Sequence, residues 1–303
     1  MVGQRRLSVM DYALGIDVGA TNVKAVAVTG AGYILKQDRF ATHDCESAPW
    51  ADAVRDYILR IETEVGSARW LGIACPGLAA RDHRSIAWMQ GRMAALQGLD
   101  WTQFLGREQL IPVLNDAHAA LVGETWLGAG KGVDNAVLLT IGTGVGGAVV
   151  CEGKLLRGAI GRAGHLGHLS LDPDGRLDIV NTPGSLEDAI GDCTILARSN
   201  GRFETSADLV QAVRAGDAQA TEVWLKSVKA LAAAIASIIN CVDPELVILG
   251  GGVARAGRNL FEPLSEEMDK FEWRPLGERV NIVPATLGEF AGALGAARNA
   301  MQT

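Results

Sequence analysis

Residues 13–24 read ALGIDVGATNVK, an apolar run followed at once by a polar turn and the start of a second apolar run. A run that ends in Gly-Ala-Thr-Asn is typical of a buried strand entering a tight hairpin. Residues 23–28 continue as the second strand, and after the turn TGAG at 29–32 a third strand is predicted over 33–36. This strand–turn–strand unit determines the fold class because the chain contains it twice.

The second copy lies at residues 137–151, VLLTIGTGVGGAVVC, and a third strand is again predicted after it, over 154–156. The two copies are about 125 residues apart, a period too long for a repeat solenoid. They indicate a duplicated α/β domain, with a first domain over 1–116, a second over 117–286 and a closing helix over 287–303 that belongs to the first. Because no low-complexity linker separates the halves, we expect the two domains to share a cleft.

The remaining segments have the periodicities of helices and buried strands. Apolar residues at three-to-four spacing predict helices over residues 50–65 and 224–239. Short apolar runs predict strands over 70–74, 111–114 and 246–249. The alternation of the two kinds of segment is that of an α/β protein.

Charge and cysteine content exclude several classes of protein. The chain has 28 Lys and Arg against 35 Asp and Glu, a formal net charge of −7, and its longest basic run is the pair Arg5–Arg6. This balance argues against a nucleic-acid partner and against an anionic membrane surface. The five cysteines are an odd number with no C-x-C or C-x-x-C pair, so neither a disulfide framework nor a cysteine-rich metal site is predicted. No apolar stretch of signal-peptide length follows the N-terminus and the run at 230–239 is too short to cross a bilayer, so we expect a cytoplasmic protein.

Glycine is the outlier of the composition, with 37 of 303 residues, about 12%, where about 7% is usual. In the two hairpin turns, glycine lets backbone N–H groups that have no ladder partner approach an anion closely. Two such turns, one per domain, could bind a polyphosphate, or each could be an ordinary hairpin. The candidate phosphate ligands in the turns are Gly19, Thr21, Asn22, Gly142, Thr143 and Gly144. Beside the first turn, Lys24 is a candidate phosphate contact, and the Asp17 carboxylate could hold a phosphate-bound Mg²⁺ through water.

Two further segments follow predicted strands. Gly250, Gly251 and Gly252 could pack against the flat face of a nucleotide, although such a triplet also makes a plain strand-to-helix turn. Asn115 and Asp116 lie where a strand ends and a helix begins. Both residue types are good helix N-caps. Ligands of open α/β sheets, however, bind at the carboxyl ends of strands, where Asp116 could accept a proton from a substrate hydroxyl.

The segment GHLGH places His165 and His168 three residues apart, between glycines. With no cysteine and no clear third ligand nearby, imidazoles that bind substrate hydroxyls are favoured over a metal pair. Glu187, after the turn PGS, is either a first-turn helix carboxylate or a second acceptor for substrate hydroxyls.

In this order, the motifs resemble those of the ROK family (repressor, open reading frame, kinase) of sugar kinases, within the actin, hexokinase and Hsp70 superfamily. Residues 17–24 are similar to the first phosphate motif, 115–124 to the segment with the catalytic aspartate, 142–159 to the family signature and 249–252 to the adenosine motif. The resemblance covers nearly the whole chain. It implies a two-domain actin-like ATPase fold of the ribonuclease H-like type, with duplicated mixed β-sheet cores and a cleft between the domains.

The same resemblance implies a glucokinase-like hexose kinase that uses ATP and Mg²⁺ and acts, as is typical of such kinases, on the 6-hydroxyl. Asp116 would be the general base. The sugar-binding residues would be Gly77, Arg92, Asn115, His168 and Glu187. A homodimer is expected by family analogy.

The chain departs from the family pattern at two points. The family usually has Glu-x-Gly-His where this chain has His165 to His168, so an imidazole replaces a sugar-binding carboxylate and the preferred sugar is left open. The family's zinc site needs a cysteine cluster before Glu187, and residues 169–186 contain none, so we expect no zinc and a His168 available to the sugar. Because only a dozen or so residues precede the first strand, we expect a kinase rather than a repressor with a DNA-binding domain.

Two other functions stay open at this point. A non-catalytic sugar-binding regulator is favoured if His165 prevents productive sugar binding. A superfamily kinase could also act on another sugar, such as an N-acetylhexosamine, or on a non-sugar such as a carboxylate.

Overall fold

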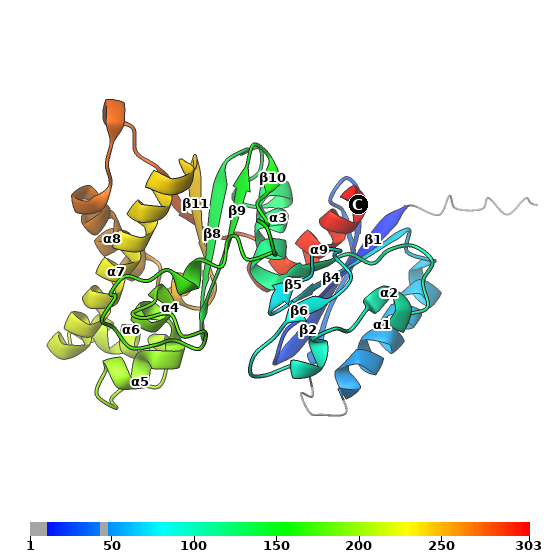
Figure 1. Ribbon diagram of the computed structural model, residues 1–303, viewed down its shortest axis with the longest axis horizontal. Helices are drawn as coiled ribbons and strands as arrows, with labels where there is room; N and C mark the ends of the chain where they lie inside the picture. Colours follow the sequence, from blue (N-terminus) through cyan, green and yellow to red (C-terminus); the bar gives the residue numbers. More distant parts are fainter. Residues whose placement is uncertain (1–10, 43–47) are drawn as a thin grey trace, which may run out of the picture. The chain divides into compact units, whose positions relative to one another are not determined.

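The structure of this chain is a computed structural model that describes residues 11–42 and 48–303. Cys45 and the pair Arg5–Arg6 lie outside the described residues. Helices and strands alternate along most of the described chain, as the sequence predicts (Figure 1).

The chain divides into two compact units. Unit 1 comprises residues 1–127 and 289–303, blue to cyan and red in Figure 1, and unit 2 comprises residues 128–288, green to orange. The sequence pattern predicts the first boundary at residue 116. Helix α3 (Asp116–Leu127) nevertheless belongs to unit 1, because it packs along the C-terminal helix α9 (Ala291–Gln302).

Unit 1 is built on a five-stranded mixed sheet with the order β3-β2-β1-β4-β7. Its strands are β1 (Tyr12–Val18), β2 (Asn22–Thr29), β3 (Ile34–Ala41), β4 (Trp70–Cys75) and β7 (Val113–Asn115). The first three strands form antiparallel hairpins and the last two add in parallel, so the predicted opening hairpin is confirmed. In its register Asp17 is opposite Lys24, which places both charges beside the turn.

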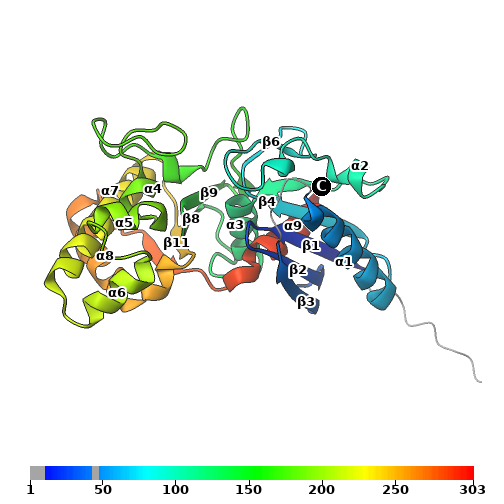
Figure 2. The ribbon, with the colours of Figure 1, turned by 90° about the horizontal axis from the view of Figure 1, so that it is seen from below.

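Alternation along β1 decides what covers each face of this sheet. Leu14 and Ile16 point to one face and join the core formed with α1 (Pro49–Val65). Gly15 points to the other face, where α9 lies; a Cβ at this position would overlap the carbonyl oxygen of Ala293. Helix and strand backbones therefore touch here, which only glycine permits. Figure 2 shows α9 and α1 with the strands β1 and β2.

The shorter elements of unit 1 lie mostly between β4 and β7. They are β5 (Leu78–Ala79), β6 (Ile86–Trp88), η1 (Ala94–Leu96) and α2 (Trp101–Phe104), with η6 (Gly288–Phe290) leading into α9. Asp100 caps α2 by accepting a hydrogen bond from the N–H of Gln103.

Unit 2 repeats the architecture of unit 1. Its sheet has the order β10-β9-β8-β11-β12, again with three antiparallel strands followed by two parallel ones. The strands are β8 (Ala136–Ile141), β9 (Val145–Cys151), β10 (Lys154–Leu155), β11 (Leu246–Gly250) and β12 (Asn281–Pro284). The duplicated mixed sheet expected from the two glycine hairpins is thereby confirmed.

Unit 2 contains one long helix, α7, and several shorter helical elements. They are η2 (Leu166–His168), α4 (Leu186–Ile190), η3 (Asp192–Thr194), α5 (Ile195–Arg198), α6 (Ser206–Arg214), α7 (Ala218–Val242), η4 (Val253–Ala256), α8 (Arg258–Phe271) and η5 (Pro275–Gly277). By length and composition α7 is apolar enough to cross a membrane, with a mean hydropathy of 1.6 in its most apolar window. Half of that window is buried inside unit 2, where α7 packs against α4, α6 and α8, so it is placed as a core helix.

Candidate active site

The turn between β1 and β2 has its carbonyl groups held by the protein. The carbonyl of Gly19 accepts a hydrogen bond from the Thr42 hydroxyl (2.7 Å), and that of Thr21 accepts one from the Thr42 N–H (2.9 Å). The carbonyl of Ala20 accepts one from the guanidinium of Arg92 (2.5 Å). In a trans peptide the N–H points opposite to the C=O. The N–H groups of Ala20 and Thr21 therefore face away from these donors, as an anion-binding turn requires.

The turn between β8 and β9 is arranged in the same way. The carbonyl of Gly142 accepts from the N–H of Asp192 (2.9 Å), and the carbonyl of Thr143 accepts from the N–H of Cys193 (2.8 Å). The carbonyl of Gly144 accepts from the N–H of Gly142 (2.9 Å). The N–H groups of Thr143 and Gly144 point away from these partners, so each unit carries one turn whose carbonyl oxygens are hydrogen-bonded within the protein.

Asp17 and Lys24 form an ion pair of 3.1 Å beside the first turn. Burial of the Asp17 carboxylate raises its pKa, and the charge of Lys24 acts in the opposite direction. The carboxylate also lies against Gly292 in the first turn of α9, where a Cβ would come within 2.9 Å of it. Mg²⁺ in nucleotide sites keeps several waters and needs only one or two carboxylates besides the phosphates. A single buried carboxylate beside a phosphate-type turn fits that requirement.

Asn115 caps helix α3. Its side-chain oxygen accepts hydrogen bonds from the N–H groups of Ala117 (3.0 Å) and His118 (3.2 Å), and its amide donates to the carbonyl of Gly77 (3.0 Å). The capping alternative for Asn115 is thus realised, and it leaves one amide hydrogen for another partner. The same bonds bring Gly77 and Asp116 to the end of β7.

Asp116 is the first residue of α3, and its side chain is open to solvent. Desolvation by the surrounding protein, with a further contribution from the negative charge of Asp17, raises its pKa to about 6. A carboxylate of that pKa is ionised at neutral pH and is a stronger base than an ordinary aspartate, which is the property a general base needs.

Glu187 lies against the second glycine turn. It occupies the first turn of α4, and its Oε2 accepts a hydrogen bond from the N–H of Val145 (2.8 Å). A Cβ on Gly144 would overlap this carboxylate, and a Cβ on Gly167 would overlap the carbonyl of Val145. Unit 2 therefore brings Glu187, the second turn and the histidine segment into contact with one another.

The two histidines differ in their surroundings. His165 precedes η2 and is partly buried; burial lowers its pKa, with a further contribution from His168, so its imidazole is neutral at pH 7. His168 ends η2, and its Nδ1 lies 2.8 Å from the carboxylate of Asp178.

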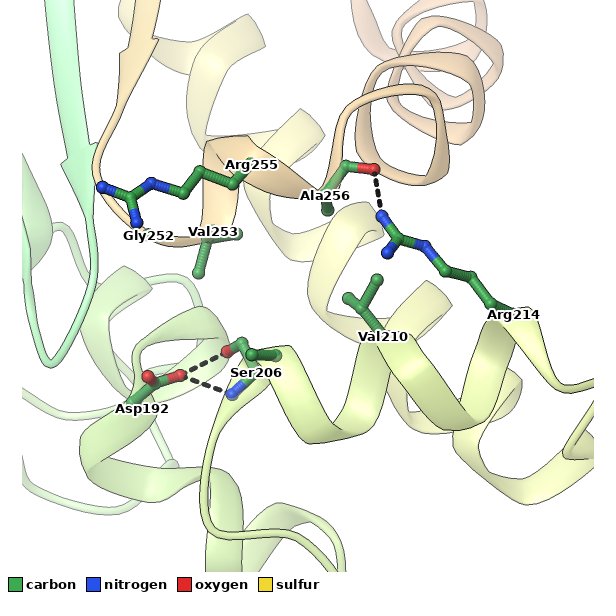
Figure 3. A pocket seen from close by; sticks show the side chains of 9 residues that line it. Asp192, Ser206, Val210, Arg214, Gly252, Val253, Arg255 and Ala256 are labelled. Carbon is green, nitrogen blue, oxygen red and sulfur yellow. Dashed lines mark hydrogen bonds between the residues drawn. The ribbon is translucent and has the colours of Figure 1, made fainter. Parts of the chain in front are cut away.

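A pocket of about 330 Å³ lies beside the predicted adenosine motif (Figure 3). It is lined by Asp192, Ser206, Ala207, Val210, Arg214, Gly252, Val253, Arg255 and Ala256. Of the three predicted glycines, only Gly252 lines the pocket. Gly250 is the last residue of β11, and a Cβ on Gly251 would overlap the carbonyl oxygen of Ile141. The backbone of Asp192 bonds to the second glycine turn and its carboxylate bonds to Ser206, so pocket and turn share this residue.

Potential metal ligands do not cluster in the described residues. No group of three or more His, Cys, Asp or Glu side chains there could hold a metal ion. The described cysteines, Cys75, Cys151, Cys193 and Cys241, are free.

Sequence reasoning missed four residues of these sites: Thr42, Asp178, Asp192 and Gly292. None lies in a glycine motif, and each acts through a partner distant in the sequence. Only Gly292, a glycine in the first turn of a helix, carries a local signal. One guanidinium nitrogen of Arg92, a residue expected at the sugar, donates to the carbonyl of Ala20 in the first turn.

Comparison with known proteins places these features in a family. The model of the ROK family matches residues 13–303. A glucokinase of Thermotoga maritima is 34% identical over 94% of this chain and 95% of its own, and an N-acetylmannosamine kinase of Yersinia pseudotuberculosis is 30% identical over 82% of this chain and 85% of its own. The crystal structure of a ROK family glucokinase from Streptomyces griseus in complex with glucose and AMPPNP is similar, with a TM-score of 0.80 and 26% identity over 96% of this chain and 100% of that one.

Proposed function

This chain belongs to the ROK family and has its actin-like ATPase fold, and we propose that it is an ATP-dependent hexose kinase of the glucokinase type. The observation that carries the proposal is Asp116, an exposed carboxylate at the end of a strand with a pKa raised to about 6. The 34% identity to a glucokinase and the complex of a similar structure with glucose and AMPPNP support the choice of substrates.

In the proposed reaction the Asp116 carboxylate accepts the proton of the attacking sugar hydroxyl, which we assign as the 6-hydroxyl. The hydroxyl oxygen forms a bond to the γ-phosphorus of ATP as the bond to the β-phosphate oxygen breaks. Positioning and charge stabilisation supply most of the rate of such transfers. The sugar ligands we assign are Gly77, the remaining amide hydrogen of Asn115, His165, His168 and Glu187.

The phosphates are assigned to the two glycine turns. The phosphate ligands that we assign in unit 1 are Gly19, Thr21 and Asn22 with Lys24, and those in unit 2 are Gly142, Thr143 and Gly144. The tied carbonyl groups described above support this assignment, because they orient the N–H groups without any movement of the protein. Mg²⁺, when bound, supplies neutralisation of the phosphate charge, and Asp17 would hold it through water.

The nucleotide base is assigned to the pocket beside Gly252. Its floor carries no side chain at Gly252, where a Cβ would meet nothing within 4 Å, so a flat ring can lie against the backbone. In Figure 3 the Arg255 side chain extends over this end of the pocket, and it is exposed. Arginine stacks well on aromatic rings. The proposal further includes a zinc-free, cytoplasmic homodimer without a nucleic-acid or membrane partner.

The proposal is tested by an ADP-release assay over glucose, mannose, N-acetylglucosamine, N-acetylmannosamine and acetate, with ATP and Mg²⁺. We expect the highest kcat/KM with glucose. A preference for an N-acetylhexosamine or for acetate would overturn the glucose assignment. Measurable sugar binding with no turnover of any substrate would favour the non-catalytic regulator, which His165 in place of a carboxylate still permits.

The Thr42→Val variant tests the phosphate assignment of the first turn. Valine keeps the shape of threonine but removes the hydroxyl that holds the Gly19 carbonyl. We expect KM for ATP to rise about fivefold, the effect of one lost hydrogen bond, with KM for the sugar unchanged. The control is Thr63→Val, which removes a hydroxyl bonded to its own helix α1. Equal KM values for ATP in wild type and Thr42→Val would rule out the assignment.

A further inference from the structure

The segment that joins the two proposed sugar ligands His168 and Glu187 is built around the carboxylate of Asp178. One oxygen lies 2.8 Å from His168 Nδ1. The other accepts hydrogen bonds from the N–H groups of Val180 (2.9 Å) and Thr182 (2.8 Å). The Asp178 side chain is fully buried, with 0% exposed.

Backbone hydrogen bonds also connect the two ends of this segment. The N–H of Leu171 donates to the carbonyl of Gly184 (2.8 Å), and the N–H of Leu186 donates to the carbonyl of Leu169 (2.9 Å). The two ends of the segment thus run side by side, and Asp178 closes the loop between them. Burial opposes ionisation of this carboxylate, but the hydrogen bonds, that from His168 above all, lower its pKa below the ordinary value. It therefore acts as a buried anion with three donors around it, from His168, Val180 and Thr182, the condition under which such burial is tolerated.

The residues here do not fit the zinc site of the family pattern. Residues 169–186 contain no cysteine, and no group of three or more potential ligands lies together in the described part of the chain. We propose that Asp178 organises this segment in place of a metal. It is a positioning residue that folds residues 169–187 and holds His168 in the tautomer whose Nε2 accepts a hydrogen bond from a sugar hydroxyl.

The tautomer follows from the chemistry of the pair. An ionised carboxylate can only accept hydrogen bonds, so His168 Nδ1 must carry the proton. The neutral ring then has its lone pair on Nε2, and the side chain is 27% exposed. Glu187 adds a second acceptor. A surface of acceptors selects neutral polyols, which donate O–H groups, and it disfavours carboxylate substrates, which have none to donate.

This inference rests on the proposed function for the role of His168 but has a test of its own. The chain has five histidines, so ¹⁵N-histidine labelling gives a small spectrum, and His168→Gln assigns the residue. At pH 8 we expect His168 in the wild type to be protonated at Nδ1. In Asp178→Asn the amide keeps an oxygen for Val180 and Thr182 and turns its NH₂ to His168, so the proton should move to Nε2.

In Asp178→Asn, the kinetic test is whether KM changes for the sugar but not for ATP. We expect KM for the sugar to rise about tenfold, because the Nε2–H of His168 then faces the O–H of the sugar hydroxyl. KM for ATP should be unchanged, and kcat should stay within about threefold of the wild-type value. The matched control is Asp217→Asn, which changes a capping carboxylate at the start of α7, outside this segment. Circular dichroism checks that both variants fold.

Three results overturn the inference: Nε2 protonation of wild-type His168, an Asp178→Asn variant with unchanged tautomer and sugar KM, or one equivalent of zinc per chain by elemental analysis. Because the NMR measurement needs no turnover, the two proposals fail separately. An inactive wild type with Nδ1-protonated His168 contradicts only the kinase assignment. An active wild type with Nε2-protonated His168 contradicts only the role of Asp178.

Discussion

Asp116→Asn is expected to lower kcat by about 10²- to 10⁴-fold, the usual contribution of a general base. The amide cannot take the proton of the attacking hydroxyl. It keeps a side-chain oxygen that can accept the hydrogen bond from the N–H of Ala117, so the start of α3 should be preserved. The measurement is kcat for the hexose and ATP pair that the wild type prefers, with KM for both substrates followed in parallel.

The control for this variant is Asp52→Asn. Asp52 is also an aspartate in the first turn of a helix of unit 1, and its exposed carboxylate forms an ion pair with Arg55. We expect its kcat to equal that of the wild type. If Asp116→Asn retained more than about a tenth of wild-type kcat, the assignment of Asp116 as base would be wrong.

The raised pKa of Asp116 gives the same assignment a pH signature. The base must be ionised, so kcat should fall as the pH drops through about 6, and this limb of the pH profile should disappear in Asp116→Asn.

The free energy of unfolding depends on pH in the opposite direction. Between the ordinary pKa of 3.8 and about 6 the folded state holds a proton that the unfolded chain has released. This group therefore lowers the free energy of unfolding as the pH rises through that window. Urea unfolding at pH 8 should find Asp116→Asn no less stable than the wild type.

Gly295→Ala is expected to lower the free energy of unfolding by about 3 kcal/mol, at the upper end of the range for overpacked cores. A Cβ at this position would overlap the carbonyl oxygen of Ala119 and come 2.5 Å from its carbon. Both atoms belong to the backbone of α3, so no side chain can move aside. The helices α3 and α9 would have to separate, and because α3 begins at Asp116, kcat should fall as well. Urea unfolding measures the first effect and the ADP-release assay the second.

Gly30→Ala is the matched control in the same unit. A Cβ there meets nothing within 4 Å, and Gly30 is not among the residues with positive φ. Alanine should therefore be neutral or stabilise by a few tenths of a kcal/mol, since it restricts the unfolded chain. Equal stability of Gly295→Ala and the wild type would mean that α3 and α9 do not pack through their backbones.

The parts of the fold that depend on local patterns were predictable. Strands β1 and β8, their glycine turns, and the helices α1 and α7 each follow from hydrophobic spacing and turn residues over a few neighbouring positions. The position of Asp116 at a strand end was predictable for the same reason. The boundary of unit 1 was not, because α3 is assigned by its packing on α9, far away in the sequence.

By itself, the sequence determined the two strand–turn–strand hairpins, the duplicated α/β fold that they imply, and the family to which their motifs belong. All of these are properties of short segments. The tertiary structure alone decided that Arg92 and Thr42 hold the first turn, that Glu187 lies on the second, and that Asp178 holds His168. These contacts join residues whose separation along the chain leaves no periodic signal. The pKa of Asp116 is of the same kind, because desolvation by the surrounding protein and the charge of Asp17 exist only once the chain has folded.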